Sequence, residues 1–342
     1  QLLIPIFANH TPQEYKMHKL SKLAHIVSAF TLAAAASTAG LPALAAAPSA
    51  ATVTISHAKG STTLAAAPKR VVVYDLGALE ILQALDVPVT GGPKAQWPHY
   101  MADYTRQFRV AGSLFEPDYD ALSALHPQLI IVGGRSSAKQ ESLSKIAPTL
   151  DFSMGGDAGF LPSLERNITQ LAMLYGKQAQ GEALIARIHQ ELQALRQLSN
   201  QAAPGLLLMG INEKIMPQAP GTRFGQVLFD VMGVKPALNA QDIPARGGPA
   251  YTFDDLAKLN PDWIYVIDRN TAVGSAAGGG DIIASEKVFD NAQVKASAAG
   301  QKGQVVFLDP KGWYLMGSSG PLSLLANIEQ LKTAYRAAGL RP

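Results

Sequence analysis

The sequence predicts an α/β fold in which two Rossmann-like α/β lobes are joined by a single long helix, with a ligand cleft between the lobes. Short β-branched runs alternate with helical stretches in two separate blocks, which is typical of largely parallel sheets covered by helices. A long amphipathic helix is expected between the two blocks. The expected boundaries are residues 46–159 for the N-terminal lobe, 160–200 for the linking helical segment and 201–342 for the C-terminal lobe.

The N-terminal lobe is expected to open with a strand and to contain three more. The clearest strand is Leu129-Ile-Ile-Val132, which is fully apolar and runs into two glycines. A short helix is expected over 119–125, because Asp118 can cap its first turn and Pro127 follows its end. The expected strands are 52–55, 70–74, 129–132 and 150–153, and the expected helices are 77–85, 119–125 and 136–146.

The linking segment is expected to hold two helices, at 160–175 and 181–198, interrupted by Gly176. The second helix carries apolar residues at helical spacing on one face, namely Leu184, Ile188, Leu192, Leu195 and Leu198. A single helical crossover permits little hinge motion, so we expect only a small closure on ligand. The C-terminal lobe restarts the alternation, with expected strands at 206–209, 263–267 and 305–308 and expected helices at 224–232, 253–259 and 321–338.

Residues 17–45 are expected to be a cleaved signal peptide. The segment Met17-His-Lys-Leu-Ser-Lys22 supplies a basic start, residues 24–36 supply an apolar run, and Ala43-Leu44-Ala45 fits an A-x-A cleavage site. Residues 1–16 precede that methionine and are expected to be an upstream segment. A transmembrane anchor is the alternative, but the apolar run is short and is soon broken by glycine and proline.

The composition limits the partners of the mature chain. Without residues 1–45 it holds 26 Lys and Arg against 25 Asp and Glu, so its net charge is about +1. No basic block suggests a nucleic-acid partner. The sequence has no cysteine, which excludes disulfides, thiolate metal sites and the lipid-bearing cysteine of exported lipoproteins. We therefore expect a soluble monomer in the periplasm that is not a lipoprotein.

Three arginines stand at the ends of expected strands or in loops, each beside glycine or a turn residue. They are Arg135 after Ile-Ile-Val-Gly-Gly, Arg223 in Pro-Gly-Thr-Arg-Phe-Gly, and Arg269 after Tyr-Val-Ile-Asp. The carboxyl ends of strands in an open α/β sheet are where such folds bind ligands. A guanidinium group stays charged and offers five donors in a rigid fork. Three that converge would make a cavity for a compact polyanion, whereas the alternative is three unrelated surface arginines.

The sequence lacks the common signatures of an enzyme. Gly317-Ser318-Ser319-Gly320 does not have the G-x-S-x-G spacing of a nucleophile elbow, and there is no P-loop. The histidines beyond the signal peptide are scattered, without a pair at metal-binding spacing. We expect no catalytic residues, no metal ligands and no cofactor, and an exported α/β hydrolase is only a remote alternative.

The chain resembles a known family, the periplasmic binding proteins of iron–siderophore ABC importers. These are the helix-backbone, class III substrate-binding proteins, which also include haem and cobalamin binders. The resemblance covers roughly residues 52–340 and is carried by five stretches: 68–75, 116–135, 222–225, 260–269 and Trp313-Tyr-Leu315. It implies capture of a ferric siderophore in the periplasm and delivery to the importer permease in the inner membrane, with iron bound only as the chelate.

The subgroup that the chain resembles binds catecholate siderophores. Its three cleft arginines correspond to Arg135, Arg223 and Arg269. A ferric tris-catecholate carries three negative charges on an aromatic body, which guanidinium groups can balance and hydrogen-bond. Aromatic side chains can form the walls, with arginine over their faces. The candidates are Trp97, Tyr100, Tyr104, Tyr251, Trp313 and Tyr314, of which Trp97, Trp313 and Tyr314 are included in the predicted site with the arginines.

The sequence departs from the family in one respect. Some relatives coordinate iron directly, through a histidine followed by glycine and through the tyrosine of the terminal Trp-Tyr-Leu segment. Tyr314 is present here, but Arg246 stands at the place of the histidine. The resemblance therefore predicts a fourth arginine at the cleft mouth and no direct capture of iron by a histidine–tyrosine pair.

Two further expectations follow from the resemblance. The family docks on its permease through exposed acids on each lobe, for which Glu80 and Asp230 are candidates. Haem or another tetrapyrrole, or cobalamin, is the alternative ligand. Haem would require an axial tyrosine or histidine, for which Tyr100 or Tyr314 could serve, although three arginines exceed what its two propionates need.

Overall fold

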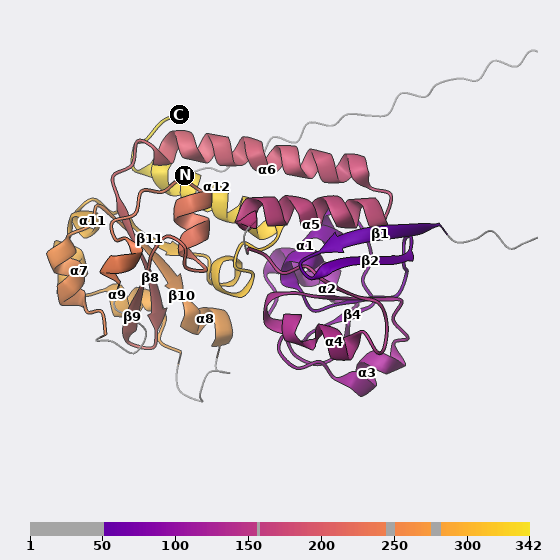
Figure 1. The fold of residues 1–342 in the computed structure, drawn as a ribbon. Coiled ribbons are helices and arrows are strands. Elements are labelled where there is room, and N and C mark those ends of the chain that lie inside the picture. The colour runs from indigo at the N-terminus through magenta and orange to yellow at the C-terminus, as the bar shows by residue number, and fades with distance from the viewer. Residues whose placement is uncertain (1–50, 156–157, 244–249, 275–281) are drawn as a thin grey trace, which may run out of the picture. The chain divides into compact units, whose positions relative to one another are not determined.

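The computed structural model describes residues 51–155, 158–243, 250–274 and 282–342. The expected upstream segment and signal peptide, and Arg246, lie outside these ranges. Residues 50–342 form one compact unit. Two separate sheets within it define the two lobes, and long helices lie along both (Figure 1).

The sheet of the N-terminal lobe has five parallel strands in the order β5-β4-β3-β6-β7. Strands β4 and β5 are only two residues long, so the apolar pattern that identified β6 could not find them. The strands are β3 (Val71–Val73), β4 (Gly91–Gly92), β5 (Arg109–Val110), β6 (Leu129–Val132) and β7 (Thr149–Asp151). The helices around it are α1 (Leu76–Ala84), the 3₁₀ helix η1 (His99–Met101), α2 (Ala102–Thr105) and α3 (Tyr119–Ala124).

The expected helix over 136–146 is wrong in form. The chain makes a 3₁₀ helix, η2 (Gly134–Lys139), and then a short turn of α-helix, α4 (Gln140–Leu143). Ser136 explains the tight start, because its hydroxyl oxygen accepts from the N–H of Gly133 and its hydroxyl donates to the Gly133 carbonyl. Such local side-chain bonds compete with regular helix.

The expected entry strand is one half of a separate hairpin. Strand β1 (Thr52–His57) pairs antiparallel with β2 (Gly60–Ala65), which the sequence reading missed. Gly60 allows the tight turn, since its φ is +127°. The hairpin lies on helix α5, where the Ser56 N–H donates to the Gln170 side chain at 2.8 Å.

The sheet of the C-terminal lobe has four strands in the order β11-β10-β8-β9. Strands β8 (Gly205–Ile211), β10 (Trp263–Asp268) and β11 (Val305–Leu308) are parallel, whereas β9 (Lys214–Gln218) forms a hairpin with β8. Strand β9 was missed because it contains a proline, which is tolerated on an edge strand. The shorter α-helices of this lobe are α7 (Phe253–Leu259), α8 (Arg269–Val273), α9 (Ser285–Phe289), α10 (Ala292–Ala296) and α11 (Ala298–Gln301).

Two segments of the C-terminal lobe near the site are π-helical, namely η4 (Gln226–Val231) and η7 (Lys311–Leu315). A regular helix over 224–232 was expected, so the position of the element is confirmed but not its form. A 3₁₀ turn, η5 (Ala240–Asp242), also belongs to this lobe. Wide π turns are frequently found at functional sites.

Long helices connect the lobes. Helix α5 (Phe160–Leu174) is followed by α6 (Gln178–Ser199), and α6 packs against both α5 and α12 (Pro321–Ala337) (Figure 1). Four residues of the predicted apolar face of α6, Ile188, Leu192, Leu195 and Leu198, are buried, whereas Leu184 is half-buried. Helix α12 belongs to the C-terminal lobe but packs against α1 of the N-terminal lobe. One continuous hydrophobic core therefore runs through both lobes, from strand β3 to strand β10.

Candidate functional site

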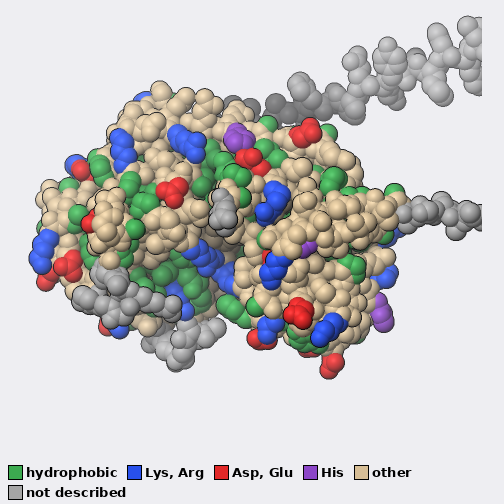
Figure 2. Space-filling model, viewed as in Figure 1, with side chains coloured by type: hydrophobic (Ala, Val, Ile, Leu, Met, Phe, Trp, Pro, Cys, Tyr) green, Lys and Arg blue, Asp and Glu red, His purple; other side chains and the backbone are tan. Residues whose placement is uncertain are grey.

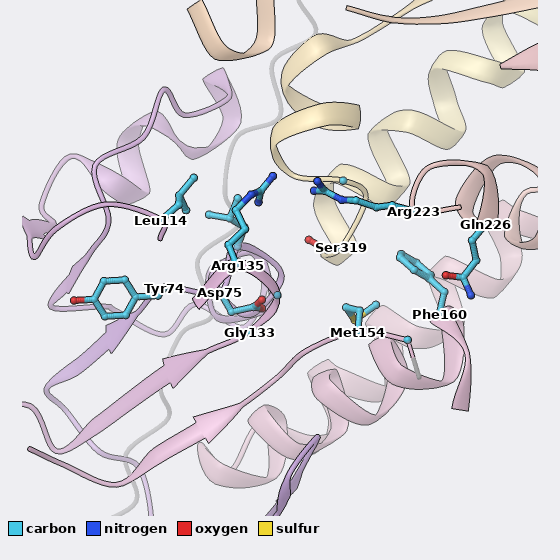
Figure 3. Close-up of a pocket in the computed structure, with 14 residues that line it drawn as sticks. Tyr74, Asp75, Leu114, Gly133, Arg135, Met154, Phe160, Arg223, Gln226 and Ser319 are labelled. Carbon is cyan, nitrogen blue, oxygen red and sulfur yellow. The ribbon is translucent and has the colours of Figure 1, made fainter. Parts of the chain in front are cut away.

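A cavity of about 590 Å³ lies between the lobes and is lined by residues of both. From the N-terminal side its lining includes Tyr74, Asp75, Leu114, Gly133, Arg135, Met154 and Phe160, and from the C-terminal side Arg223, Gln226, Gly317 and Ser319 (Figure 3). On the face in Figure 2, basic and hydrophobic side chains gather in the hollow between the lobes. We call this space the arginine cavity.

The ends of two neighbouring strands form one wall of the arginine cavity. Tyr74 and Asp75 directly follow β3, and Gly133 to Arg135 follow β6. Gly133 is required here, because a Cβ atom at this position would lie 2.4 Å from the Asp75 Oδ2. Gly134 has a φ of +48°, which favours glycine and turns the chain so that Arg135 enters the cavity.

Arg135 and Arg223 come from different lobes and meet at the same backbone oxygen. The Arg135 Nη2 donates to the Tyr314 carbonyl at 3.5 Å, and its Nη1 donates to the Leu315 carbonyl at 3.2 Å. The Arg223 Nη2 donates to the Tyr314 carbonyl at 3.3 Å. Figure 3 shows the two guanidinium groups facing each other. The structure thus brings together two arginines that are 88 positions apart in the sequence.

Among the described residues these two arginines have no carboxylate in direct contact, although the charge of Asp75 acts on Arg135 from nearby. Within the described ranges neither forms an ion pair, and their partners are neutral carbonyl groups. Burial lowers the pKa of both side chains. The charge of Arg135 lowers the pKa of Arg223 further, to about 10, so Arg223 remains protonated at neutral pH. Arg135 is half-buried and Arg223 is exposed at the cavity, and the two cations repel each other, so an anion bound between them would relieve the repulsion.

Arg269 does not line the cavity, but it contacts Tyr314, whose carbonyl accepts hydrogen bonds from Arg135 and Arg223. Its Nε donates to the Tyr314 hydroxyl at 2.9 Å, and its guanidinium carbon lies 5.7 Å from the centre of that ring. Phe224 packs on the ring of Tyr314, with centroids 5.9 Å apart. All three predicted arginines therefore contact Tyr314, two through its carbonyl and one through its hydroxyl.

The two predicted tryptophans lie outside the cavity lining. Trp313 is fully buried in the core, and its Nε1 has no hydrogen-bond partner among the described residues. Trp97 is half-buried, packs edge-on against Phe108 at 6.2 Å, and offers its carbonyl to the Nζ of Lys311 at 3.1 Å. In this structure both contribute to packing at the junction of the lobes.

Other residues supply the apolar part of the wall. Leu114, Met154 and Phe160 line the cavity, and none of them was predicted from the sequence. Leu114 precedes Phe115, whose exposed fraction is 59%. The pair of adjacent apolar residues in this loop could have indicated a binding surface, since exposed apolar patches often mark such surfaces.

Glu80 is wrong as a candidate for permease contact, because it is fully buried. Its Oε1 accepts from the Tyr100 hydroxyl at 2.7 Å, and its Oε2 accepts from the N–H and the hydroxyl of Ser323 at 2.8 and 3.0 Å. Glu80 thus caps the first turn of α12 from the other lobe. Asp230 is exposed, and its contact with a permease stays a prediction.

Two further features of the described residues bear on function. Among the described residues no group of three His, Cys, Asp or Glu side chains is placed to hold a metal ion. No helix in those residues is both long enough and apolar enough to cross a membrane. The predicted replacement of an iron-binding histidine by Arg246 lies outside the described residues.

Comparison with known proteins gives consistent matches. A model of the periplasmic binding protein family matches residues 71–311. Petrobactin-binding protein YclQ of Bacillus subtilis is 33% identical over 82% of this chain and 87% of its own length, and its crystal structure superposes with a TM-score of 0.75 at 31% identity, covering 83% of this chain and 99% of the other. Ferric-anguibactin-binding protein FatB of Vibrio anguillarum is 28% identical over 78% of this chain and 83% of its own length.

A solved catecholate-siderophore binding protein, VctP from Vibrio cholerae, has a TM-score of 0.71 and 28% identity over 84% of this chain and all of the other. These relatives are binding proteins rather than enzymes. The two α/β lobes, the cavity between them and the match over most of the chain agree with the predicted resemblance. The chain belongs to the periplasmic binding protein family.

Proposed function

We propose that this protein captures a ferric siderophore, of the catecholate type, in the periplasm and delivers it to the permease of an inner-membrane ABC importer. The observation that carries the proposal is the pair Arg135 and Arg223, two cations from opposite lobes that share a cavity and bind only neutral carbonyl groups. The names of YclQ, FatB and VctP, each a siderophore-binding protein, support the class of ligand.

The chemistry of the cavity fits a ferric catecholate. Such a chelate presents anionic oxygens around iron and aromatic rings on its outside. Guanidinium groups that now donate to carbonyls could donate instead to charged oxygens, and charge-assisted hydrogen bonds are about twice as strong as neutral ones. Leu114, Met154 and Phe160 would contact the rings. A volume near 590 Å³ is within the usual range for small-ligand sites.

The structure also suggests how iron would be treated. The Tyr314 hydroxyl is engaged by Arg269, and its carbonyl is held by the other two arginines. We infer that Tyr314 positions the arginines and that the chelate is recognised by charge and shape, with iron remaining in its siderophore. The protein would act as a monomer, without a cofactor of its own.

Titration of intrinsic fluorescence tests this proposal, since the chain contains three tryptophans. We expect quenching by a ferric tris-catecholate at submicromolar concentration and much weaker quenching by the iron-free ligand. A neutral ferric hydroxamate and haem are the comparison ligands. Binding of the hydroxamate without binding of the catecholate would contradict the proposal, and selective binding of haem would favour the tetrapyrrole alternative.

A further inference from the structure

Asp75 is a buried acid on the wall of a cavity that otherwise suits anions. Its exposed fraction is 8%, and it lines the arginine cavity together with Gly133 and Arg135. A carboxylate at this place opposes the capture of a polyanion, because it repels the charge that the guanidinium groups attract. The proposed function makes no use of this residue, so its presence calls for an explanation.

The two carboxyl oxygens of Asp75 have different surroundings. Oδ1 accepts from the Ala78 N–H at 2.7 Å and so caps the first turn of α1. Oδ2 receives no hydrogen bond from the part of the chain that the structure describes. The missing side chain of Gly133 leaves it room, and Figure 3 shows the carboxyl group beside Gly133 at the cavity. Oδ2 is therefore an unpartnered polar atom that a ligand can reach.

The charged groups that act on Asp75 come from three elements. Arg135 on η2 favours its ionised form, whereas Asp151 on β7 and Glu80 on α1 oppose it. Asp151 is itself charged, because hydrogen bonds from two serines and an ion pair with a lysine lower its pKa despite its burial. The segment before α12 adds only the neutral Ser319 to this wall. Burial has the largest influence and raises the pKa of Asp75 to about 7.

We propose that Asp75 couples ligand capture to proton uptake: in the complex the acid is neutral, keeps its proton on Oδ2 and donates a hydrogen bond from Oδ2–H to an anionic ligand oxygen. The proton comes from the solvent and returns to it when the ligand leaves, so no other reactant is needed. The inference deepens the proposed function and rests on it, because anionic ligand oxygens are what the acid would meet. An uncharged ligand would bind without taking up this proton, so we expect the pH dependence of affinity to be specific to anionic ligands.

The direction of the pH dependence follows from this coupling. In acid solution Asp75 is already neutral in the empty protein, and binding takes up no proton. At higher pH the empty protein holds a carboxylate, and an anionic ligand must draw a proton from solution to bind. For each unit by which bound ligand raises the pKa of Asp75, the affinity at high pH is about tenfold lower than the affinity at low pH. We expect a loss of about tenfold between pH 6 and pH 8.5.

Asp75→Asn is the variant that tests the coupling. Asparagine caps helices as well as aspartate does, so α1 keeps its first turn while the titrating group is lost. The dissociation constant of a ferric hexadentate tris-catecholate would be measured from pH 6 to pH 8.5 for wild type and variant. We expect the ratio of variant to wild-type affinity to rise about tenfold over this range. Because both proteins meet the same ligand, proton chemistry of the chelate itself cancels.

Asp118→Asn is the matched control. Asp118 also caps a short helix of the N-terminal lobe, accepting from the Ala121 N–H at 3.0 Å, but it is exposed and does not line the cavity. Its variant should follow the wild-type pH profile. Calorimetry in buffers of different ionisation enthalpy should show uptake of about half a proton at pH 8 by wild type and by the control, and none by Asp75→Asn.

Three outcomes are separable. Parallel pH profiles for wild type and Asp75→Asn, or binding by wild type without proton uptake, would overturn the inference and leave the proposed function standing. Failure of wild type to bind the ferric catecholate at any pH would overturn both. As a check that needs no variant, carbon-13 spectra of the carboxyl groups with the diamagnetic gallium chelate should show Asp75 about half protonated at pH 8 in the complex and largely ionised in the empty protein, and an equally ionised Asp75 in both would also overturn the inference.

Discussion

Two of the places where the lobes meet treat charge in opposite ways. In the arginine cavity, Arg135 and Arg223 bring two positive charges against neutral carbonyls. At the contact of α1 with α12, Glu80 is buried completely, and three hydrogen bonds satisfy its oxygens. A buried polar group whose partners are all present serves the fold, whereas a charged group left without its opposite is available to a ligand.

The largest expected effect concerns the cavity. Arg135→Ala should weaken binding of a ferric catecholate by about 2–5 kcal/mol, which is roughly 30-fold to several-thousandfold in the dissociation constant. The melting temperature of the empty protein should stay the same or rise, because repulsion from Arg223 is removed. Fluorescence titration and a thermal melt measure the two effects.

Arg196→Ala is the control for Arg135→Ala, since Arg196 also donates to a backbone carbonyl, that of Val231, but does not line the cavity. It should leave affinity unchanged. Equal losses of affinity in the two variants would break the contrast between cavity and contact.

Glu80→Ala should show the reverse pattern. It leaves the N–H and hydroxyl of Ser323 and the Tyr100 hydroxyl without their buried acceptor, which we expect to cost about 4 kcal/mol of unfolding free energy. Affinity for the chelate should change little in the protein that remains folded. Denaturant titration measures the stability, and a variant that kept its stability but lost affinity would show that Glu80 belongs to the site.

Glu80→Gln tests the same contrast through the pH dependence of the unfolding free energy. Burial raises the pKa of Glu80 to about 7, from 4.5 in an unfolded chain, so the folded protein binds a proton between these values. The contribution of Glu80 to stability is therefore fully present below pH 4.5 and is lost as pH rises through 7. Relative to Glu80→Gln, wild type should lose about 2–3 kcal/mol of unfolding free energy from pH 5 to pH 8. Identical pH profiles of the two proteins would contradict this expectation.

Tyr314→Phe should have the smallest effect. It removes the hydroxyl that fixes Arg269 but keeps the carbonyl that holds the other two arginines. We expect affinity to fall by up to about 1 kcal/mol, the usual contribution of one hydrogen bond. The catecholate-to-iron absorption band should not move, and a band shift that depends on this hydroxyl would show that Tyr314 ligates iron.

Much of the fold could be predicted from the sequence, because strands buried on both faces are continuous apolar runs. Strands β6 and β11 and helix α7 were predicted to the residue. Strands β4 and β5 were not, since two-residue strands have no periodicity. Strand β2 and strand β9 were missed because each returns through a tight turn, and a proline in β9 argued against a strand.

A site residue could be predicted only where its type and its position after a strand were enough to place it at the ligand-binding edge of the sheet. Arg135 could be placed because it follows a clear strand and two glycines. The environment of Glu80 could not be, since its partner Ser323 lies 243 positions away and only tertiary packing brings them together. Trp313 was proposed as a ligand wall because tryptophan suits both an aromatic cavity and a core, and composition alone does not distinguish these surroundings.

The continuous core has a consequence for how the protein comes apart. Trp97 reports on the N-terminal lobe and Trp263 on the C-terminal lobe, and both belong to or pack against the same set of buried side chains. Each sheet also has a smaller cluster of its own on the opposite face, but loss of the shared core from one sheet would expose the other, so we expect unfolding to be one cooperative transition despite the two-sheet architecture. The calorimetric and van 't Hoff enthalpies should agree, and occupation of the cavity should raise a single melting temperature for the whole body.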